Sequence, residues 1–373
     1  MAFHHDSGDL VRNAGYRMPA EWEPHEATWI AWPHYRADWP GKFAAVPWVF
    51  GEVVRHLHRH ERVRILVENG WLERRARRLL LQAQVDLAAV EFHQVATNRS
   101  WLRDTGPIFV RGGDSGPAEM GILDWQFNGW ARYSNWRRDD VVPAAIARLL
   151  GLKCRQPRIS PGGRRIVLEG GGIDVNGRGT LVTTEECLLS PIQARNPGVS
   201  RPEMEDIFRH YLGVAKVIWL GRGIAGDDTH GHVDDIARFV NPTTLVVSVE
   251  SDRRDANYEA LRENRRRLAE ATDQDGRPLR MVELPMPRPL IFRGQRLPAS
   301  YANFYIANRT VLVPTFNDPN DRLALSRLSR LFPERSVVGI HSVDLAWGFG
   351  TLHCLTLQQP LHGSSGGRPA RWP

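Results

Sequence analysis

Residues 226–235 place two histidines and four aspartates in one short stretch, with two glycines and little apolar cover. If this stretch is extended, side chains two residues apart share a face, so His230, His232 and Asp234 would point into one space. Such a face can coordinate a divalent metal ion. It can equally hold a cation while one histidine transfers protons. These two chemistries belong to different classes of enzyme.

The metal interpretation has a motif behind it, because the same stretch resembles the Thr-His-x-His-x-Asp-His pattern of metallo-β-lactamase-type hydrolases. The resemblance ends at Asp235, which stands where that pattern has a histidine. Such sites also need distant histidines to complete their coordination, and residues 236–340 contain none. We therefore expect no metal. A metal-dependent hydrolase built on His230, His232 and Asp234 stays an alternative from a different class.

A covalent interpretation starts from Cys354, which follows the glycine-rich residues 347–350. Glycines before a cysteine let the backbone approach whatever the thiol attacks. A lone cysteine is more often a small buried hydrophobe than a nucleophile. A distant histidine with carboxylates is what would activate it, and residues 226–235 supply both.

Two further carboxylates stand in contexts that suggest a shared site. Asp104 lies between Arg103 and a glycine-proline turn, and Glu169 ends an apolar run before three glycines. Alone, Asp104 could pair with Arg103 or cap a turn, and Glu169 could be a solvated loop acid. Together with a thiol, a histidine and Asp234, they indicate one site. Because carboxylates that share a site repel one another and take up protons, this cluster predicts a cationic substrate.

The other two cysteines compete with Cys354 for the role of nucleophile. Acidic neighbours would raise the pKa of the Cys187 thiol by like-charge repulsion. Basic neighbours could lower the pKa of Cys154, but no histidine or glycine turn is near it. We interpret both as structural. An odd number of cysteines in a chain expected in the cytoplasm does not predict a disulfide framework.

The charge of the chain does not predict a nucleic-acid partner. The net charge is +7, but only Lys42, Lys153 and Lys216 are lysines among 49 basic residues, and no recognition motif accompanies the arginines. No apolar run approaches the roughly 18 residues of a membrane span, so no membrane partner is expected. Residues 1–9 lack the basic and apolar regions of a signal peptide, which predicts a cytoplasmic location.

The elements that would position these residues alternate between strands and helices. Turn residues bound predicted strands at 28–32, 63–67, 108–110, 180–183, 245–249 and 311–313. Helical patterns cover 71–84, 202–212, 255–271 and 321–332.

A weak internal repeat runs through this alternation. Asn176, Asn241 and Asn308 each begin a turn that feeds an apolar strand, at spacings of 65 and 67 residues. Five such units would account for most of the chain. Repeats of mixed α/β composition that bury a common core predict a radial array.

Within roughly residues 16–360, the chain contains ordered blocks at 18–22, 29–33, 101–107, 168–172, 183–189, 227–234, 299–306, 353–354 and 358–360. In these blocks it resembles agmatine deiminases and the related bacterial-type peptidylarginine deiminases of the guanidine-modifying (pentein) superfamily. The resemblance implies an α/β fold, the pentein five-bladed α/β propeller with pseudo-fivefold symmetry. Residues 16–360 would form a single catalytic domain, with a flexible N-terminus at 1–15 and a disordered tail at 361–373.

The resemblance also implies a role for each site residue. By motif position, Cys354 matches the nucleophile and His232 the general acid/base. Asp104 and Asp234 match the carboxylates that hold the guanidinium, and Glu169 matches the fifth site acid. The implied reaction is hydrolytic deimination through a covalent amidino-cysteine intermediate, without a metal or an organic cofactor. The expected partner is a small cationic guanidinium compound, and self-association into a homo-oligomer is left open.

Substrate choice is less constrained than the chemistry. Phe349 and Thr351 stand where agmatine deiminases have glycine and asparagine, and residues 187–197 look about two residues longer than the usual form. Agmatine is favoured by its frequency in the family, which would give N-carbamoylputrescine on the route to putrescine. Peptidylarginine and free arginine stay alternatives, and Trp101 is a candidate wall for the substrate. A non-catalytic guanidine-binding protein is a further alternative, which the complete residue set disfavours.

Overall fold

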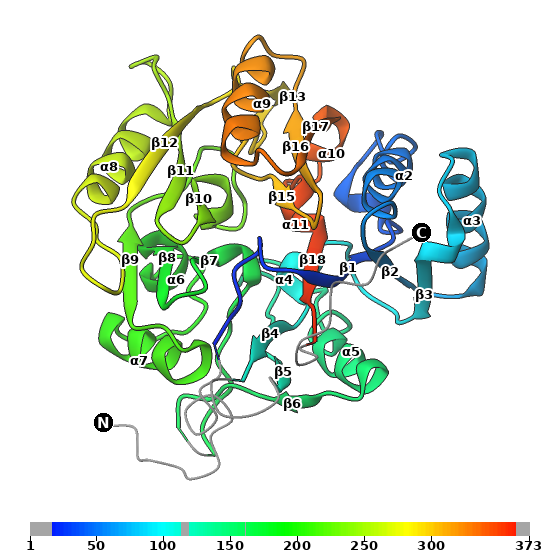
Figure 1. The fold of residues 1–373 in the computed structure, drawn as a ribbon, viewed down its shortest axis with the longest axis horizontal. Helices are drawn as coiled ribbons and strands as arrows, with labels where there is room; N and C mark the ends of the chain where they lie inside the picture. Colours follow the sequence, from blue (N-terminus) through cyan, green and yellow to red (C-terminus); the bar gives the residue numbers. More distant parts are fainter. Residues whose placement is uncertain (1–16, 113–118, 161, 363–373) are drawn as a thin grey trace.

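The computed structural model of the 373-residue chain describes residues 17–112, 119–160 and 162–362. The strands in these ranges form five sheets of related topology and one two-stranded hairpin (Figure 1). The predicted flexible N-terminus at 1–15 and residues 363–373 of the predicted tail lie outside the described residues. Leu361, where that tail was expected to begin, donates its backbone N–H to the Pro24 carbonyl at 2.7 Å.

Four of the sheets repeat one pattern of three strands. An inner strand pairs antiparallel with the middle strand that follows it in the chain, and the middle strand pairs parallel with an outer strand through a helix. Parallel neighbours need such a long crossover, which is why a helix follows each middle strand. Figure 1 shows the inner strands around the middle of the molecule, with the helices at its periphery.

The bounds of these four units follow the chain. The second unit contains β4 (Ile108–Arg111), β5 (Met120–Leu123), α5 (Val142–Leu150) and β6 (Lys153–Arg155). The third contains β7 (Ile173–Val175), β8 (Thr180–Thr184), α6 (Glu185–Leu189), α7 (Arg201–Leu212) and β9 (Lys216–Leu220). The fourth contains β10 (Ala237–Asn241), β11 (Thr244–Val249), α8 (Tyr258–Ala269) and β12 (Arg280–Pro285). The fifth contains β15 (Tyr305–Ile306), β16 (Thr310–Thr315), α9 (Asn320–Leu331) and β17 (Ser336–His341), after the hairpin β13 (Ile291–Phe292) and β14 (Gln295–Arg296).

The first unit joins the two ends of the described chain. Its inner strand is the last one, β18 (Thr356–Pro360), which pairs antiparallel with β1 (His25–Ala31). β1 then pairs parallel with β2 (Arg62–Val67), and β2 with β3 (Val90–Gln94). The connections carry η1 (Arg36–Asp38), α2 (Val46–Leu57), α3 (Gly70–Gln82) and η2 (Leu87–Ala89). The predicted five-unit α/β organisation of the pentein type is confirmed.

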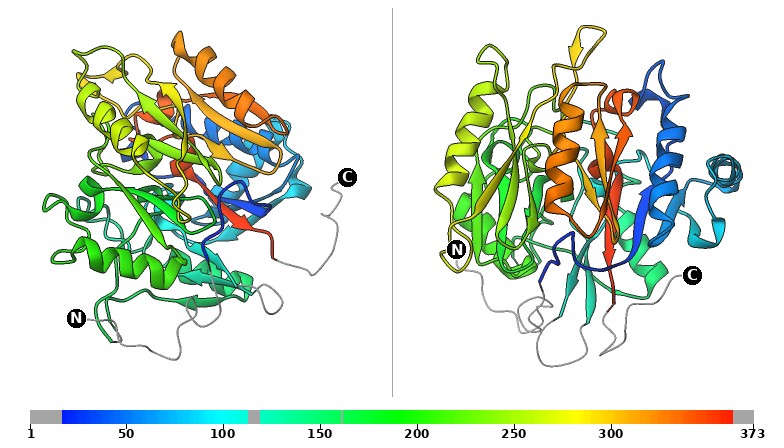
Figure 2. Two further views of the ribbon diagram at one scale, coloured as in Figure 1. Left: turned by 60° about the vertical axis from the view of Figure 1, so that its left-hand side comes forward. Right: turned by 45° about the horizontal axis from the view of Figure 1, so that its top comes forward.

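Local sequence explains where the outer helices begin, end and pack. Helix α7 begins with a capping box between Ser200 and Glu203 and ends at Gly213, whose φ of +68° is left-handed. Helix α2 buries Val46, Phe50 and Leu57 on one face, at helical spacing. Burial of each such side chain stabilises the fold by about 1.5–3 kcal/mol. The apolar cores therefore lie between the sheets and the surrounding helices. Both views in Figure 2 show the long helices on the outer side of the strands.

The predicted asparagine repeat is confirmed as the turn between inner and middle strands. Asn176 accepts hydrogen bonds from the backbone N–H groups of Arg178 and Thr180, and Asn241 accepts one from Thr243. Asn308 occupies the same place between β15 and β16 but bonds instead to the backbone of His25, in the first unit. The six predicted strands and four predicted helices are present, with ends shifted by up to three residues.

Four short helices precede inner strands and turn the chain toward the centre. They are α4 (Leu102–Thr105) before β4, η3 (Gly170–Gly172) before β7, η4 (Val233–Asp235) before β10 and α11 (Leu352–Leu355) before β18. α4 contacts both α11 and η3, and η3 contacts η4. The remaining short helix, α10 (Val343–Ala346), lies beside α2. Within the described ranges, none of the helices is long and apolar enough to cross a bilayer.

One buried arginine connects several units, and its removal is expected to destabilise the fold. Arg238 on β10 contacts Asp174 on β7 at 2.5 Å and Glu21 at 2.9 Å, and it donates to the Phe304 carbonyl at 2.8 Å. Arg238→Ala leaves the buried carboxylate of Asp174 without its cation and removes one of the two arginines that pair with Glu21, which costs about 3–5 kcal/mol of unfolding free energy. Urea unfolding measures this loss.

The matched control is Arg254→Ala, because Arg254 pairs with Asp252 while its side chain is 90% exposed. A surface pair of this kind contributes little, so the control should unfold like the wild type. Equal unfolding curves for the two variants would contradict the role assigned to Arg238.

Candidate active site

The predicted site residues all come from the segments that precede inner strands. Asp104 lies in α4, and Glu169 is the residue before η3. His232 begins η4 and Asp234 lies within it, and Cys354 lies in α11. All five are buried. The structure therefore brings together residues that lie far apart in the sequence. Figure 1 shows α4 and α11, the helices that carry Asp104 and Cys354, in the middle of the molecule.

The Cys354 thiol is held by an amide side chain that sequence reasoning did not single out. Asn303 donates from Nδ2 to Cys354 Sγ at 3.2 Å. The Asn303 Oδ1 atom accepts from the Thr351 hydroxyl at 2.6 Å and from the His353 backbone N–H at 3.0 Å. Thr351, one of the two departures from the family pattern, thus fixes the amide that contacts the thiol.

The electrostatic surroundings keep Cys354 protonated while the site holds no cation. Its Sγ lies 3.8 Å from Asp234 Oδ2. Burial, and then the charges of Asp234, Asp235 and Asp104, raise the pKa of the Cys354 thiol well above its usual value. A cation bound among these carboxylates would oppose that effect and favour the thiolate.

Asp234 presents one free oxygen because a histidine occupies the other. His353 Nδ1 lies 2.7 Å from Asp234 Oδ2, and His353 Nε2 lies 2.8 Å from Glu21 Oε2. Burial raises the pKa of Asp234, but the His353 hydrogen bond and charge outweigh it, so the net pKa is lowered. Within the described part of the chain, Asp234 Oδ1 has no hydrogen-bond partner. It is therefore a buried carboxylate oxygen available to a ligand.

Asp104 is oriented by two neutral donors. Trp130 donates its indole N–H to Oδ2 at 2.9 Å, and the Gly171 backbone N–H donates to Oδ1 at 2.9 Å. Gly171 must be a glycine, because an added Cβ would lie 2.7 Å from His232 Nδ1 and 2.8 Å from Asp104 Oδ1. Burial raises the pKa of Asp104, and Asp234 adds to this, against the opposing effect of His232.

His232 lies between two carboxylates without a hydrogen bond to either. Nδ1 is 3.8 Å from Asp104 Oδ2, and Nε2 is 3.6 Å from Glu169 Oε2. Both ring nitrogens have no hydrogen-bond partner among the residues that the structure describes. Burial would lower the pKa of His232, but Asp104, Cys187 and Glu169 outweigh it, and the net pKa lies well above the usual value. The ring is therefore an imidazolium at neutral pH.

Glu169 is kept ionised by a buried arginine. Arg195 donates from Nε to Glu169 Oε1 at 3.0 Å, and neither side chain is exposed. Burial raises the pKa of Glu169, but Arg195 and His232 outweigh this and lower it to about 2. Its second oxygen, which faces His232, accepts no hydrogen bond from the described residues.

A pocket opens onto Cys354 and Asp104. The other residues that line it are Arg99, Trp101, Trp130, Asp228, Thr229, Gly348, Phe349 and Gly350. The predicted wall residue Trp101 packs closely on the loop before the thiol, because an added Cβ at Gly348 or Gly350 would come within 2.8 Å of its ring. Phe349, the second departure from the family pattern, has a φ of +66°, a conformation that glycine adopts without strain.

The alternative metal site built on His230, His232 and Asp234 is wrong in its geometry. His230 and Gly231 have φ values of +64° and +91°, so the backbone is not extended and the two-residue alternation is lost. His230 Nε2 lies 3.1 Å from Ser190 Oγ, away from the centre. Asp227 shapes this loop by accepting the backbone N–H groups of Thr229, Gly231 and His232.

The two other cysteines differ from each other. Cys154 is exposed on β6, away from the central segments. Partial burial of its thiol and the charge of Asp124 raise the pKa of Cys154 to about 11, so the lowering that its basic neighbours suggested is wrong. Cys187 is buried within reach of Glu169 and His232, so it adjoins the site.

Several residues of the site were not predicted as such. Glu21, Asn303 and His353 lie inside sequence blocks that carry the family resemblance, which was the available signal. Trp130 and Arg195 act through contacts with Asp104 and Glu169 that no local pattern reveals.

The arrangement suits a planar cation next to a thiol. Asp104 lines the same pocket as Cys354, and Asp234 Oδ2 lies 3.8 Å from Cys354 Sγ, so two carboxylates place negative charge next to the thiol. Two carboxylates can accept paired N–H groups from a flat cation and fix its orientation. An adjacent imidazolium can donate a proton to a leaving group.

Comparison with known proteins places this site in a family context. The family model for Porphyromonas-type peptidyl-arginine deiminase matches residues 17–360. An agmatine deiminase of Medicago truncatula is 38% identical over 377 residues, covering 93% of this chain and 96% of that protein. One of Pseudomonas aeruginosa (strain LESB58) is 36% identical over 372 residues, covering 94% and 96%. The structure of an agmatine deiminase of Enterococcus faecalis matches with a TM-score of 0.87 at 32% identity, covering 97% of this chain and 100% of that one.

The Glu169–Arg195 pair predicts a pH-dependent stability. The pKa of Glu169 falls from 4.5 to about 2 on folding, so the pair's contribution is complete above pH 4.5 and is lost as the pH falls toward 2. The difference corresponds to about 3 kcal/mol. We expect Glu169→Gln to unfold at lower urea concentration at neutral pH, and the gap to the wild type to narrow on acidification.

Glu259→Gln is the matched control, because Glu259 forms an exposed pair with Arg262. A gap between Glu169→Gln and the wild type that stays constant from neutral pH to about pH 3 would contradict the assignment.

Proposed function

The chain belongs to the Porphyromonas-type peptidyl-arginine deiminase family, and from this premise we propose that it hydrolyses agmatine to N-carbamoylputrescine and ammonia. The observation that supports this most is the buried thiol of Cys354 next to two carboxylates, Asp104 in the same pocket and Asp234 at 3.8 Å from Sγ. Agmatine deiminases that align with nearly the whole chain supply the substrate. Such a hydrolase would act in putrescine biosynthesis.

Binding orients the substrate and activates the nucleophile in one step. Asp104 and Asp234 accept the N–H groups of the guanidinium and direct its central carbon toward Cys354 Sγ. The charge of the substrate opposes the carboxylate charges that raise the pKa of the thiol. The thiol therefore releases its proton to solvent at neutral pH, and becomes a thiolate, only when the substrate is present.

His232 then donates a proton to the leaving group and later accepts one from water. The thiolate attacks the guanidinium carbon to form a tetrahedral adduct, and the imidazolium of His232 protonates the departing nitrogen, which leaves as ammonia. An amidino-thioether on Cys354 remains. His232, now neutral, takes a proton from a water molecule whose oxygen attacks the same carbon. The C–S bond breaks, the ureido product leaves, and the thiolate returns. Glu169 favours the imidazolium form at the start of each cycle.

The far end of the pocket favours an amine over a carboxylate. Asp228 lines the same pocket as Cys354 and accepts a hydrogen bond from the Tyr133 hydroxyl at 2.5 Å. Burial raises the pKa of Asp228 to about 6, so it is mostly ionised at neutral pH. Arg99, a cation that also lines the pocket, already donates to Asp38 at 2.7 Å. An amine end, as in agmatine, is attracted to Asp228, and the carboxylate of free arginine is repelled.

Further predictions accompany this proposal. Residues 16–360 act as one domain, which the match of the family model over 17–360 supports. The protein is cytoplasmic and has neither nucleic acid nor membrane as a partner, and a homo-oligomer stays open to measurement by light scattering.

Product analysis tests the proposed reaction. The protein is incubated with agmatine, free arginine or an arginine peptide, and ammonia and ureido product are measured. We expect equal amounts of both products from agmatine and much less from the other two. Cys354→Ser should lose activity by at least about a thousandfold, because the hydroxyl has no accessible oxyanion near neutral pH. No product from any of the three substrates would contradict the deiminase proposal, and an active Cys354→Ser would contradict the covalent route.

The role of Asp228 is tested by its amide. Asp228→Asn keeps the size of the side chain but removes the charge, so the KM for agmatine should rise by about ten- to a hundredfold, as for a lost charged hydrogen bond. The discrimination between agmatine and arginine should fall by a similar factor. Tyr133→Phe is the control, since it keeps the carboxylate. An unchanged KM in a correctly folded Asp228→Asn protein would contradict the assignment.

A further inference from the structure

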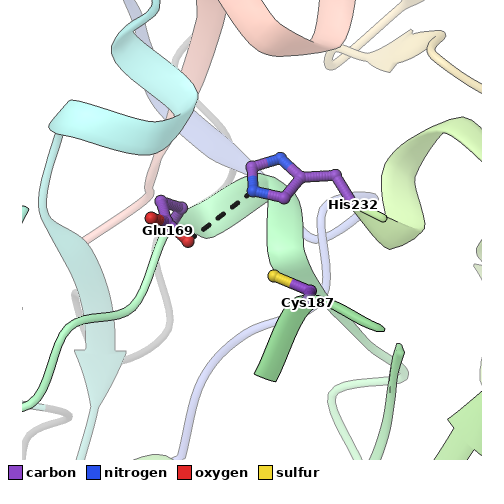
Figure 3. A group of neighbouring side chains, drawn as sticks. All are labelled: Glu169, Cys187 and His232. Atoms are coloured by element: carbon purple, nitrogen blue, oxygen red, sulfur yellow. Dashed lines mark ion pairs between the residues drawn. The ribbon is translucent and has the colours of Figure 1, made fainter. Parts of the chain in front are cut away.

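Behind the proposed acid/base lies a group of side chains to which the reaction assigns no joint role. Glu169, Cys187 and His232 each offer a ligand atom, and these atoms lie within 4.8 Å of one another. Figure 3 shows the Glu169 carboxylate and the Cys187 sulfur both near the same edge of the His232 ring. A thiol, an imidazole and a carboxylate form the ligand set that Zn²⁺ prefers in proteins.

The ligand atoms of this group are not occupied by other bonds. Glu169 uses Oε1 for Arg195, whereas its Oε2 has no hydrogen-bond partner among the described residues. The same is true of His232 Nε2. Glu169 is 0% and His232 1% exposed, so solvent does not satisfy these atoms either. Buried polar atoms without partners are costly, and such atoms facing one another indicate a space suited to a ligand.

The spacing is close to what a tetrahedral zinc ion needs. His232 Nε2 and Glu169 Oε2 lie 3.6 Å apart. Bonds of about 2.1 Å at tetrahedral angles separate two such ligands by about 3.4 Å, and a thiolate from either by about 3.6 Å. The Cys187 sulfur therefore has to move by no more than about 1 Å. Gly172 leaves room for this, since even an added Cβ would lie 3.4 Å from the sulfur.

We propose that Glu169, Cys187 and His232 bind one Zn²⁺ ion, and that the bound ion switches the enzyme off. Binding releases the Cys187 thiol proton and the Nε2 proton of His232 to solvent, and a water molecule completes the coordination. The two released protons offset the two positive charges of the ion, so the net charge of the group does not change. The site itself rests on the geometry, whereas the inhibition also rests on the proposed function.

The inhibition follows from which nitrogen the ion occupies. Nδ1 of His232 faces Asp104 and the substrate, and Nε2 faces Glu169. With zinc on Nε2, the ring keeps a single proton, on Nδ1, and can no longer exist as an imidazolium. It then cannot donate that proton and regain it from water. Because the ion lies outside the substrate pocket, zinc should lower kcat and leave KM for agmatine nearly unchanged.

Cobalt spectroscopy tests the site without any substrate. Cys354→Ser removes the pocket thiol, so Cys354 cannot contribute a cobalt signal. Co²⁺ added to this variant should give a thiolate-to-cobalt charge-transfer absorption that saturates at one ion per chain. Zn²⁺ should abolish this absorption by displacing the cobalt. The double variant Cys354→Ser/Cys187→Ser should give no such absorption. Absence of the band in Cys354→Ser, or its persistence in the double variant, would overturn the site.

Kinetics test the consequence. Zn²⁺ should inhibit agmatine turnover by the otherwise wild-type protein, EDTA should restore it, and Cys187→Ser should raise the inhibitory concentration by at least about tenfold. Inhibition that competes with agmatine, or that is equal in Cys187→Ser, would place the ion at Cys354 and overturn the proposal. A Cys187-dependent cobalt band in a protein that deiminates none of the substrates would support the metal site while contradicting the proposed function.

Discussion

Burial of several carboxylates at one point is the constraint on which this structure depends. An ionised carboxylate taken out of water costs several kcal/mol unless a cation or hydrogen bonds compensate it. Most of the central acids are compensated from within, Glu21 and Asp174 by Arg238 and Glu169 by Arg195. The buried acids at the centre are Glu21, Asp104, Glu169, Asp174, Asp234 and Asp235.

Asp104 and Asp234, the two acids beside the thiol, are compensated less completely. Asp104 accepts hydrogen bonds only from neutral donors, with the imidazolium of His232 at 3.8 Å, and Asp234 Oδ1 has no partner within the described residues. The remaining negative charge therefore acts as a preformed site for a cation. It also holds Cys354 as a thiol until that cation arrives, which links substrate binding to nucleophile activation in the proposed mechanism.

The repeated architecture explains how five distant parts of the chain meet. Each unit directs the segment before its inner strand to the centre, and each such segment carries a different side chain. Asp104, Glu169, Asp234, Asn303 and Cys354 occupy corresponding places in the five units. The five units therefore share one backbone topology, but each contributes a different side chain to the site.

A feature of the fold or of the site could be predicted from the sequence when its signal lies within one short segment of the chain. Alternating apolar residues and turn asparagines are local, and they located six strands, four helices and the repeat. Helix α5 was missed because its nine residues are a short window for a periodic pattern, although Val142, Ile146 and Ala147 are buried at helical spacing and Gly151 marks its end. The alternative metal site that included His230 failed because the left-handed backbone at His230 cannot be read from residue types. Asn303, His353 and Glu21 matter through contacts between units, which a single sequence does not show.

The most direct test compares a cationic and a neutral reagent at Cys354. The amidinium 2-chloroacetamidine and the neutral 2-chloroacetamide alkylate thiols by the same displacement, and mass spectrometry identifies the modified cysteine. We expect the cation to modify Cys354 at least about a hundredfold faster than the neutral reagent at neutral pH, since one charge close to these carboxylates is worth a few kcal/mol. Agmatine should protect Cys354 against this modification. Equal rates for the two reagents, or modification of Cys187 or Cys154 instead, would contradict the role of the carboxylates as a cation site beside Cys354.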